Sequence, residues 1–356
     1  MLQQRRRLFW IRFENEAVDP LRGEASHVRL AFVNTLIIGL LGALLATNQA
    51  AAASNLLVQT TGISVTIPSP NDPVEKEYRQ ILEDDDKAQA DANGWIQQNQ
   101  AFADKGAGVE RAALSLKIEQ RYEPVRKAYE DFLLRHPAHT RARVAFGSML
   151  NDLGRDEEAV AQWEKAHQID PQDAAVLNNL AGYYGHRGPI TNAFKYYEKA
   201  IELKPAEPLY YQNLAEVVYL FRVDAQDYYK IDEARVFQKS LDLYRQAMKL
   251  APKDFALATD WAQTYYGIKP PRYEEAVAAW NEVLPLAADQ LQKEGVLIHL
   301  ARNEISLGRF DAARNRLAQV TNDVYQVLKI RVLKSLETKQ AKFLTGETNR
   351  AKEAKP

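Results

Sequence analysis

Small and apolar residues recur along the chain at helical spacing, and the same arrangement returns after 34 residues. The segment DEEAVAQWEKAHQIDP (Asp156–Pro171) aligns with ITNAFKYYEKAIELKP (Ile190–Pro205). Both copies have a small residue, a large ring, a second small residue and a closing proline, which are Ala159, Trp163, Ala166 and Pro171 in one and Ala193, Tyr197, Ala200 and Pro205 in the other. A period of about 34 residues predicts stacked helical hairpins.

The small residues and the proline have different physical roles in such a hairpin. Two helices approach closely only where their side chains are small, so we expect the alanines at helix crossings and the ring in the groove beside them. Proline cannot continue a helix and ends the second helix of each unit. Gly154 and Gly308 are predicted to end first helices, because glycine readily adopts the positive φ found there.

Each predicted first helix carries a matching triplet of a variable, a large apolar and a small residue. The triplets are Ala145-Phe146-Gly147, Asn179-Leu180-Ala181, Asn213-Leu214-Ala215, Asp260-Trp261-Ala262 and His299-Leu300-Ala301. This pattern resembles the tetratricopeptide repeat family over residues 106–322, with four clear units after a degenerate one. The resemblance implies an all-α fold, a right-handed α-solenoid of tetratricopeptide-type helical hairpins.

One interval departs from the period. Pro205 and Pro252 are 47 residues apart, which is 13 more than one repeat. We expect the excess, within Phe221–Gln238, to lengthen both helices or to add a protruding loop. The sequence GIKPPRY (Gly267–Tyr273) predicts a stiff proline turn in the next unit.

The flanks of the repeats predict helices of their own. Residues 73–105 form an N-terminal helical segment that Asp72 caps and Pro73 begins, with Glu75 close to a capping box. Residues 323–343 form a C-terminal capping helix that covers the apolar end of the solenoid. We expect it to pack through Val324, Val327, Leu328, Ile330 and Leu333. Residues 344–356 are polar and predict a disordered tail.

The N-terminal 53 residues differ in composition from the rest. The run from Leu30 to Ser54 has no charged residue, and Ala51–Ala53 supply the small residues of a cleavage site, so residues 1–53 predict a signal peptide. The alternatives are an uncleaved membrane anchor with the arginines inside, or a buried core helix. A signal peptide places the protein in the periplasm or outside the cell, and an anchor holds the solenoid on the outer side of the inner membrane. Residues 54–72 alternate like a linker or short ribbon.

Composition narrows the possible functions. The 356 residues have a net charge of −1 and no cysteine. The charge balance gives no basic field for nucleic acid, and the lack of cysteine excludes disulfides and thiol chemistry. We expect membrane contact only through the N-terminal segment if it stays uncleaved.

Three polar clusters in the sequence are candidates for a chemical site. His136 and His139 fall in a predicted loop without a carboxylate to complete a metal site. Gln89–Gln100 has the asparagine and glycine of a calcium loop but lacks its terminal carboxylates. Glu83–Asp86 is expected to be a solvated helical face. No catalytic motif is present, so the sequence predicts no catalytic residue, no metal, no cofactor and no enzyme.

Five tyrosine doublets fall within the repeats, at residues 183–184, 196–197, 210–211, 228–229 and 265–266. One ring of each pair is expected in the core, namely Tyr197, Tyr184 and Tyr265 in three of them. The second rings suit a binding surface, because tyrosine joins apolar area to a polar tip. Tyr228 and Tyr229 beside Asp227 and Asp232 are the cluster that best fits sugar binding.

The repeat pattern predicts a groove along the first helices. Its predicted lining residues are Asn179, Asn213, Asp260, His299, Glu216, Gln263, Tyr266 and Arg302. Amides on successive helices can bond the backbone of an extended peptide. The sequence therefore predicts an exported scaffold that binds another protein or an extended peptide, as an assembly component of the cell envelope. The alternatives are an envelope polysaccharide factor and an enzyme with an unrecognised site.

Overall fold

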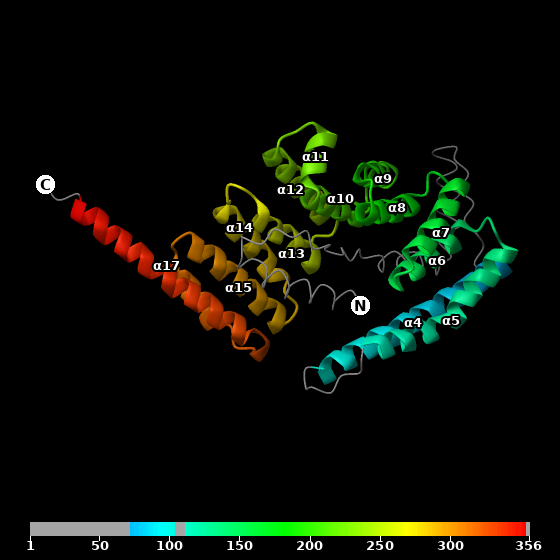
Figure 1. The fold of residues 1–356 in the computed structure, drawn as a ribbon, viewed down its shortest axis with the longest axis horizontal. Helices are drawn as coiled ribbons and strands as arrows, with labels where there is room; N and C mark the ends of the chain where they lie inside the picture. Colours follow the sequence, from blue (N-terminus) through cyan, green and yellow to red (C-terminus); the bar gives the residue numbers. More distant parts are fainter. Residues whose placement is uncertain (1–71, 104–110, 354–356) are drawn as a thin grey trace. The chain divides into compact units, whose positions relative to one another are not determined.

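The protein is a series of antiparallel α-helices joined by short turns (Figure 1), in a computed structural model that describes residues 72–103 and 111–353. Every regular element in that part of the chain is helical, which confirms the all-α fold of helical hairpins. The helices form two compact units, one ending at Tyr196 and one beginning at Tyr197. The predicted signal or anchor and the ribbon that follows it, apart from Asp72, lie outside the described residues.

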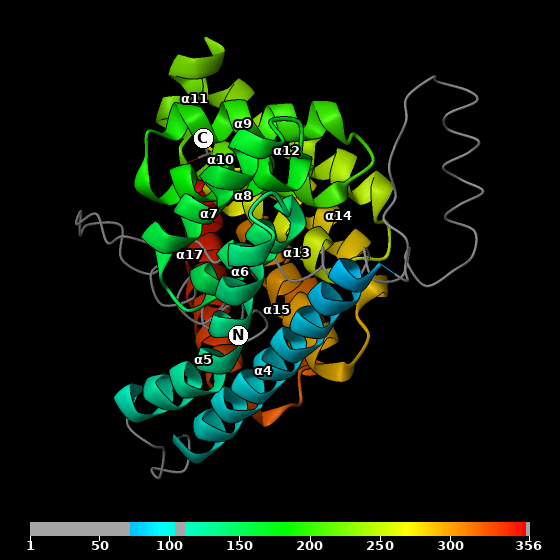
Figure 2. The same ribbon diagram turned by 90° about the vertical axis from the view of Figure 1, so that its right-hand side faces the viewer.

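The N-terminal unit contains the first hairpins. Its helices are α4 (Pro73–Ala103), α5 (Arg111–Arg135), α6 (Thr140–Asp152), α7 (Asp156–Ile169), α8 (Ala174–Arg187) and the first half of α9 (Ile190–Leu203). Helices α4 and α5 lie side by side as one long hairpin (Figures 1 and 2). The segment at residues 73–105, which was expected to precede the repeats, therefore pairs with the helix of the degenerate first repeat.

The entry to α4 is partly as predicted. The backbone N–H of Val74 donates to Oδ1 of Asp72 at 2.8 Å, so Asp72 caps the helix. Glu75 does not complete a capping box, because its carboxylate binds Arg141 and lies 3.4 Å from Nε2 of His139. A long-range ion pair therefore replaces the local cap.

The repeat residues occupy the predicted contact positions. Ala159, Ala166, Ala193 and Ala200 are fully buried, and Trp163 and Tyr197 are the buried rings between them. Gly154 has φ of 78° and Gly308 has φ of 75°, as expected for glycines that end first helices. The recurrence in the sequence thus corresponds to recurring contacts between paired helices.

An acidic side chain lies inside the hairpin of α4 and α5, where the sequence predicts a solvated face. Asp85 is buried, and the hydroxyl of Tyr129 on α5 donates to its Oδ2 at 2.9 Å. Burial raises the pKa of Asp85 to about 7, and the charges of Asp152 and Asp86 add to the rise while the Tyr129 bond opposes it. The solvated reading of Glu83–Asp86 is therefore wrong for Asp85.

This raised pKa predicts a hairpin that is more stable in mild acid. The folded pKa of Asp85 exceeds its ordinary value of 3.8, so the folded state binds the extra proton and the free energy of unfolding falls as pH rises from about 4 to about 7. Asp85→Asn should remove this dependence and raise the unfolding free energy at pH 8 by at least about 1 kcal/mol. Urea denaturation at pH 5 and pH 8 measures both effects. Asp84→Asn changes an exposed neighbouring carboxylate and is the control. A pH dependence of stability in Asp85→Asn equal to that of the wild type would contradict the assignment.

The C-terminal unit continues the hairpins. Its elements are the rest of α9, then α10 (Pro208–Leu220), α11 (Arg222–Tyr229), α12 (Glu233–Leu250), α13 (Phe255–Thr264), η1 (Tyr265–Gly267), α14 (Tyr273–Val283), η2 (Leu284–Leu286), α15 (Gln290–Ser306), α16 (Phe310–Ala318), η3 (Asp323–Tyr325) and α17 (Gln326–Glu353). Helices α10, α13 and α15 are first helices and carry three of the predicted triplets. The extra residues form the short helix α11 and lengthen α12, whereas α10 keeps ordinary length.

Helix α17 covers the end of the array through a face that differs from the predicted one. Val332 and Leu336 are buried, whereas Val324, Val327 and Ile330 are more than 60% exposed. The helix also runs on to Glu353, so the disordered tail predicted from residue 344 is wrong through that residue. Contacts with α15 and α16, rather than the apolar count of the segment, decide which face turns inward.

Candidate binding surface

Five side chains from three elements form a packed cluster on the C-terminal unit, which we call the Tyr266 cluster. Its members are Tyr266 of η1, Trp280 of α14, and His299, Arg302 and Asn303 of α15. The Tyr266 hydroxyl lies 2.6 Å from Nδ1 of His299 and accepts a bond from Nδ2 of Asn303 at 3.4 Å. The Tyr266 hydroxyl can therefore donate its own proton to Nδ1 of His299. Together the two hydrogen bonds fix the position of the tyrosine side chain.

The histidine beneath this tyrosine is neutral. The ring of His299 stacks on Trp280, with centroids 4.1 Å apart and planes 6° apart. Burial, and to a lesser degree the charge of Arg302, hold the pKa of His299 well below its ordinary value. His299 therefore supports Tyr266 as an uncharged hydrogen-bond partner at physiological pH.

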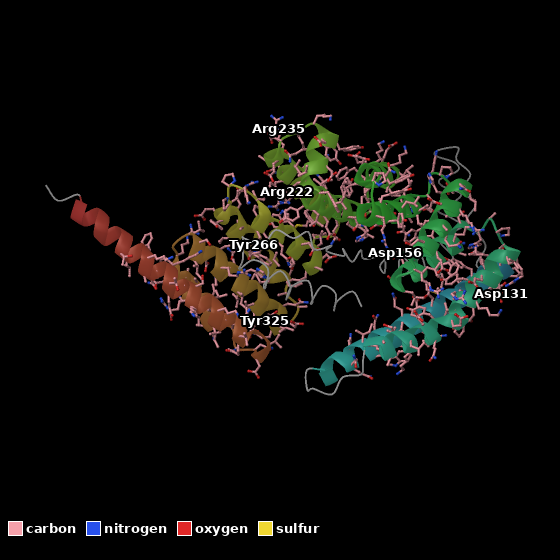
Figure 3. The ribbon with its side chains drawn as sticks, in the orientation of Figure 1. Asp131, Asp156, Arg222, Arg235, Tyr266 and Tyr325 are labelled. Carbon is pink, nitrogen blue, oxygen red and sulfur yellow. The ribbon has the colours of Figure 1, made fainter. Side chains whose placement is uncertain are left out.

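The outer side of the cluster faces solvent. The Tyr266 side chain is 36% exposed, and the guanidinium carbon of Arg302 lies 5.5 Å from its ring centroid. Figure 3 shows Tyr266 among the helices of this unit. An exposed ring whose hydroxyl is fixed and whose neighbour is a cation offers apolar area, a π face and positive charge at one place.

The structure brings together three predicted groove residues, Tyr266, His299 and Arg302, in this cluster. Of the other predicted residues in the unit, Asp260 accepts a bond from Gln212 at 2.9 Å, and Glu216 and Gln263 are half-buried. Asn303 and Trp280 were not predicted as site residues. Asn303 follows His299 by one helical turn, and Trp280 has the ring position of Trp163 in its own repeat, so both signals were present in the sequence.

The two predicted asparagines are less open than the groove hypothesis assumes. Asn179 and Asn213 are each 4% exposed. Nδ2 of Asn179 donates to Oγ of Ser148 at 3.3 Å, and Asn178 donates to Oδ1 of Asn179 at 3.3 Å. Asn179 belongs to the N-terminal unit and Asn213 to the C-terminal one. Their bond to a peptide backbone stays a prediction.

The tyrosine doublets divide between core and surface, and two of the three rings expected in the core are not buried. Tyr197 is in the core as predicted, but Tyr184 and Tyr265 are only half-buried, and Tyr210 is the second fully buried ring. Tyr184 stacks on Tyr196 instead, with centroids 5.7 Å apart. Repeat register does not fix which ring of a doublet points inward, because the two rings are only 100° apart on a helix.

The sugar-type cluster on α11 has its polar groups engaged within the protein. Tyr228 donates to Oε2 of Glu198 at 3.0 Å, and Asp232 caps α12 by accepting from the N–H of Arg235 at 2.8 Å. Lys239 lies over the Tyr229 ring, with Nζ 4.1 Å from the centroid. These contacts fasten α11 to α9 and α12.

The histidines singled out in the sequence have structural roles. Nδ1 of His139 accepts from the N–H of Ala142 and caps α6, and the carboxylate that was not expected nearby is Glu75. That carboxylate is already bound to Arg141. In residues 72–103 and 111–353 no group of three or more metal-ligating side chains lies together, and Gln89–Gln100 is helical within α4.

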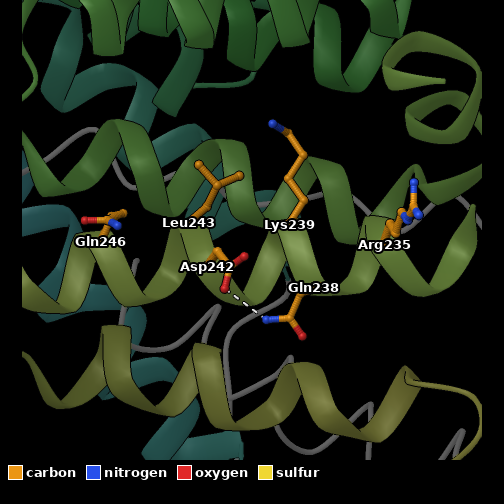
Figure 4. Close-up of a pocket in the computed structure, with 6 residues that line it drawn as sticks. All are labelled: Arg235, Gln238, Lys239, Asp242, Leu243 and Gln246. Carbon is orange, nitrogen blue, oxygen red and sulfur yellow. Dashed lines mark hydrogen bonds between the residues drawn. The ribbon is translucent and has the colours of Figure 1, made fainter. Parts of the chain in front are cut away.

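A hollow of about 360 Å³ lies on α12 (Figure 4). All of its lining residues come from this one helix, namely Arg235, Gln238, Lys239, Asp242, Leu243 and Gln246. Gln238 donates to Asp242 at 2.9 Å across it. Side chains of a single helix do not converge on a ligand from several directions, unlike those of the Tyr266 cluster. No helix among those described is long and apolar enough to cross a membrane.

Serial hairpins with alanine crossings and an exposed aromatic cluster define a helical-repeat protein of the kind that binds other proteins. The chain contains tetratricopeptide repeats. The family model described as "TPR repeat" matches residues 147–186, and the one described as "Tetratricopeptide repeat" matches residues 174–207. These matches cover α7 and α8 and reach past α9, where the sequence copies are most regular.

The similar curated proteins are named for assembly. Photosystem I assembly protein Ycf3 of Rippkaea orientalis is 26% identical over 134 residues, which is 35% of this chain and 78% of that protein. The protein of the same name from Chaetosphaeridium globosum is 29% identical over 141 residues, 37% of this chain and 83% of that protein. The similarity thus covers about a third of the chain.

Two solved structures align with the chain at low identity. YrrB, described as a TPR protein with an unusual peptide-binding site, aligns with a TM-score of 0.44 and 14% identity, covering 59% of this chain and 99% of that chain. PilW, described as a type IV pilus biogenesis factor, aligns with a TM-score of 0.47 and 14% identity, covering 68% and 97%.

Proposed function

We propose that this protein is a scaffold that binds an extended segment of another protein on the first-helix surface of its C-terminal unit. By first-helix surface we mean the surface formed by α10, α13 with η1, and α15. The observation that carries the proposal is the Tyr266 cluster, in which an exposed tyrosine is held by His299 and backed by Trp280. Tyrosine, tryptophan and arginine are the residues that most often dominate binding energies.

Rigidity makes this tyrosine a suitable anchor. A ring that is already fixed by hydrogen bonds loses little conformational entropy when a partner packs on it. Asn303 and His299 hold the Tyr266 hydroxyl, and Arg302 lies over its ring. A partner side chain can therefore gain contact area without the entropy loss of ordering a mobile ring.

Further along the same surface, half-buried polar groups suit a peptide backbone. Gln212 and Asp260 bond each other between α10 and α13, and Glu216 and Gln263 directly follow the triplets of these helices. Such side chains can exchange internal bonds for bonds to backbone N–H and C=O groups. This arrangement favours a segment that runs from one first helix to the next.

The wider role that we propose is assembly of a protein complex outside the cytoplasm. The names of the similar curated proteins support an assembly role. The uncharged run Leu30–Ser54 and the small residues Ala51–Ala53 support export, to the periplasm or beyond, or anchoring at the inner membrane. N-terminal sequencing of the mature protein checks the export step, which predicts a start near Ser54.

A pair of tyrosines in the C-terminal unit tests the binding proposal. Tyr266 is 36% exposed and Tyr273 is 37% exposed, but only Tyr266 belongs to the cluster. Tyr266→Ala should weaken binding of the partner by about tenfold or more, because it removes an anchor of the interface. Tyr273→Ala removes the same side chain from the start of α14 and should leave affinity within about twofold. Calorimetry with a partner captured by full-length protein from an envelope fraction measures both.

The result that would overturn the proposal is equal affinity of the Tyr266→Ala and wild-type proteins. Circular dichroism of each variant shows whether the helices remain intact. If Tyr273→Ala weakens partner binding as much as Tyr266→Ala does, the binding surface lies on α14 instead.

A further inference from the structure

Helix α17 contacts α15 at the C-terminal end of the first-helix surface and carries net positive charge. Helix α17 has seven basic and three acidic residues, so its net charge is +4 in a chain whose net charge is −1. Among the side chains that the structure describes, no carboxylate forms an ion pair with Arg302 or with Lys339. These two cations come from different helices, α15 and α17.

Ser306, one turn after Arg302 on α15, connects this helix to Lys339 of α17. Oγ of Ser306 donates to the backbone oxygen of Arg302 at 3.2 Å, and Nζ of Lys339 donates to the same Oγ at 3.4 Å. Lys342 follows Lys339 by one turn of α17 and is exposed. Beside Arg302 lies the Tyr266 ring. We call Arg302, Lys339 and Lys342 the basic patch, and its Arg302 end adjoins the exposed tyrosine.

Arg302 differs in this respect from the arginines around the second helices of the same unit. Elsewhere in the same unit arginines bind carboxylates, as in Arg245 with Glu282 at 2.9 Å, Arg309 with Glu274 at 2.6 Å and Arg316 with Glu304 at 3.4 Å. These three arginines thus have carboxylate partners within the unit, whereas no such partner is seen for Arg302 among the described side chains. The basic patch on α15 and α17 is left to pair with a group from outside.

We propose that the segment bound on this surface is acidic, and that its carboxylates bind Arg302 and Lys339 while an adjacent side chain packs on Tyr266. The inference rests on the proposed function and names the chemistry of the partner. A guanidinium can hold a carboxylate through two parallel bonds, and a lysine adds a second charge without geometric demand. The tyrosine ring supplies the apolar contact that a purely ionic site lacks.

The size of the patch favours a peptide over other anions. Nucleic acid binding gains its affinity from many phosphate contacts along a charged track, and membrane binding from several cations flanking buried apolar side chains. Here Lys339 bonds Ser306, and Arg302, one turn before that serine, lies beside one aromatic ring. That arrangement matches one or two carboxylates next to an apolar or aromatic residue.

A random peptide library displayed on phage and selected against the full-length chain tests the inference. The selected peptides should be enriched in Asp and Glu. Synthetic copies should bind the double variant Arg302→Gln with Lys339→Gln about tenfold or more weaker in fluorescence anisotropy, because charge-assisted bonds are lost. Arg235→Gln with Lys253→Gln removes the same charges from an exposed part of α12 and the turn after it, and should bind within about twofold of wild type.

The outcomes separate this inference from the function on which it rests. Selected peptides that lack acidic residues, or that bind the double variant as tightly as wild type, overturn the acidic segment but leave peptide binding intact. A library that yields no peptide at all contradicts the proposed function itself. A third outcome is that the double variant binds the peptides as wild type does but no longer binds an oligonucleotide, or vesicles of equal parts phosphatidylserine and phosphatidylcholine. That outcome assigns the patch to another anion and overturns the inference.

Discussion

Gly147→Ala should destabilise the N-terminal unit by about 1–3 kcal/mol, even though alanine is the better helix former. A Cβ atom at this position of α6 would lie 2.7 Å from Cδ1 and 2.9 Å from Cε2 of the Trp163 ring. The ring cannot retreat easily, because Trp163 is buried and its Nε1 donates to the backbone oxygen of Val144 at 3.3 Å. The two helices must therefore separate.

Gly94→Ala is the matched control, since it makes the same change inside helix α4. No heavy atom lies within 4 Å of a Cβ atom built there. It should stabilise the protein by about 0.5–1 kcal/mol through reduced backbone entropy in the unfolded chain. Urea denaturation followed by circular dichroism measures both variants. Opposite signs are expected, and a stabilising Gly147→Ala would mean that α6 and α7 do not cross at this glycine.

Glu294→Ala should cost about 2–4 kcal/mol and loosen the connection from α16 to α17. Glu294 of α15 is buried, and its Oε2 accepts the backbone N–H groups of Thr321 at 3.1 Å and Asn322 at 2.8 Å. Its Oε1 accepts from the Thr321 hydroxyl at 3.0 Å. Alanine would leave the backbone N–H groups of Thr321 and Asn322 without their acceptor.

The ionisation of Glu294 gives a second readout. Burial acts to raise its pKa, but the bonds from Asn322, Gln290 and Thr321 outweigh burial and hold the pKa below the ordinary value of 4.5. The stabilisation is therefore present above about pH 4.5 and is lost as pH falls through the lower folded pKa. Hydrogen exchange at Thr321 and Asn322 should quicken in Glu294→Ala. Glu337→Ala, at an exposed site on α17, should change stability by less than about 0.5 kcal/mol, and an equal effect of the two would disprove the anchor role.

Part of the candidate surface could be predicted from the sequence. Repeat register placed Tyr266, His299 and Arg302 on or beside one first helix, and the structure joins them in one cluster. Their bonding could not be predicted, because the 2.6 Å contact depends on the turn η1 that brings Tyr266 to α15. The position of Lys339 at Ser306 of α15 depends likewise on how α17 packs.

Asp85 shows the limit of reading charge from composition. The run Glu83–Asp86 is acidic, yet Tyr78, Ile81, Asp85 and Ala88 follow one helical stripe, and that stripe is the one buried against α5. The helical spacing of this stripe was visible in the sequence, but the acidic residue within it indicated a solvent-exposed face. A hydrogen bond from Tyr129 and a raised pKa let the carboxyl group stay inside.

The sequence by itself determined the repeating hairpins of this protein, because helix crossings need small residues at fixed intervals and proline or glycine at the ends. Ala193, Ala200 and Gly308 therefore could be assigned from spacing. Tertiary structure decided the faces of helices whose pattern is ambiguous. In α17 the contacts with α15 and α16 turn Val332 and Leu336 inward and leave Val327 exposed. Burial is a property of paired surfaces, so only the packed chain could fix it.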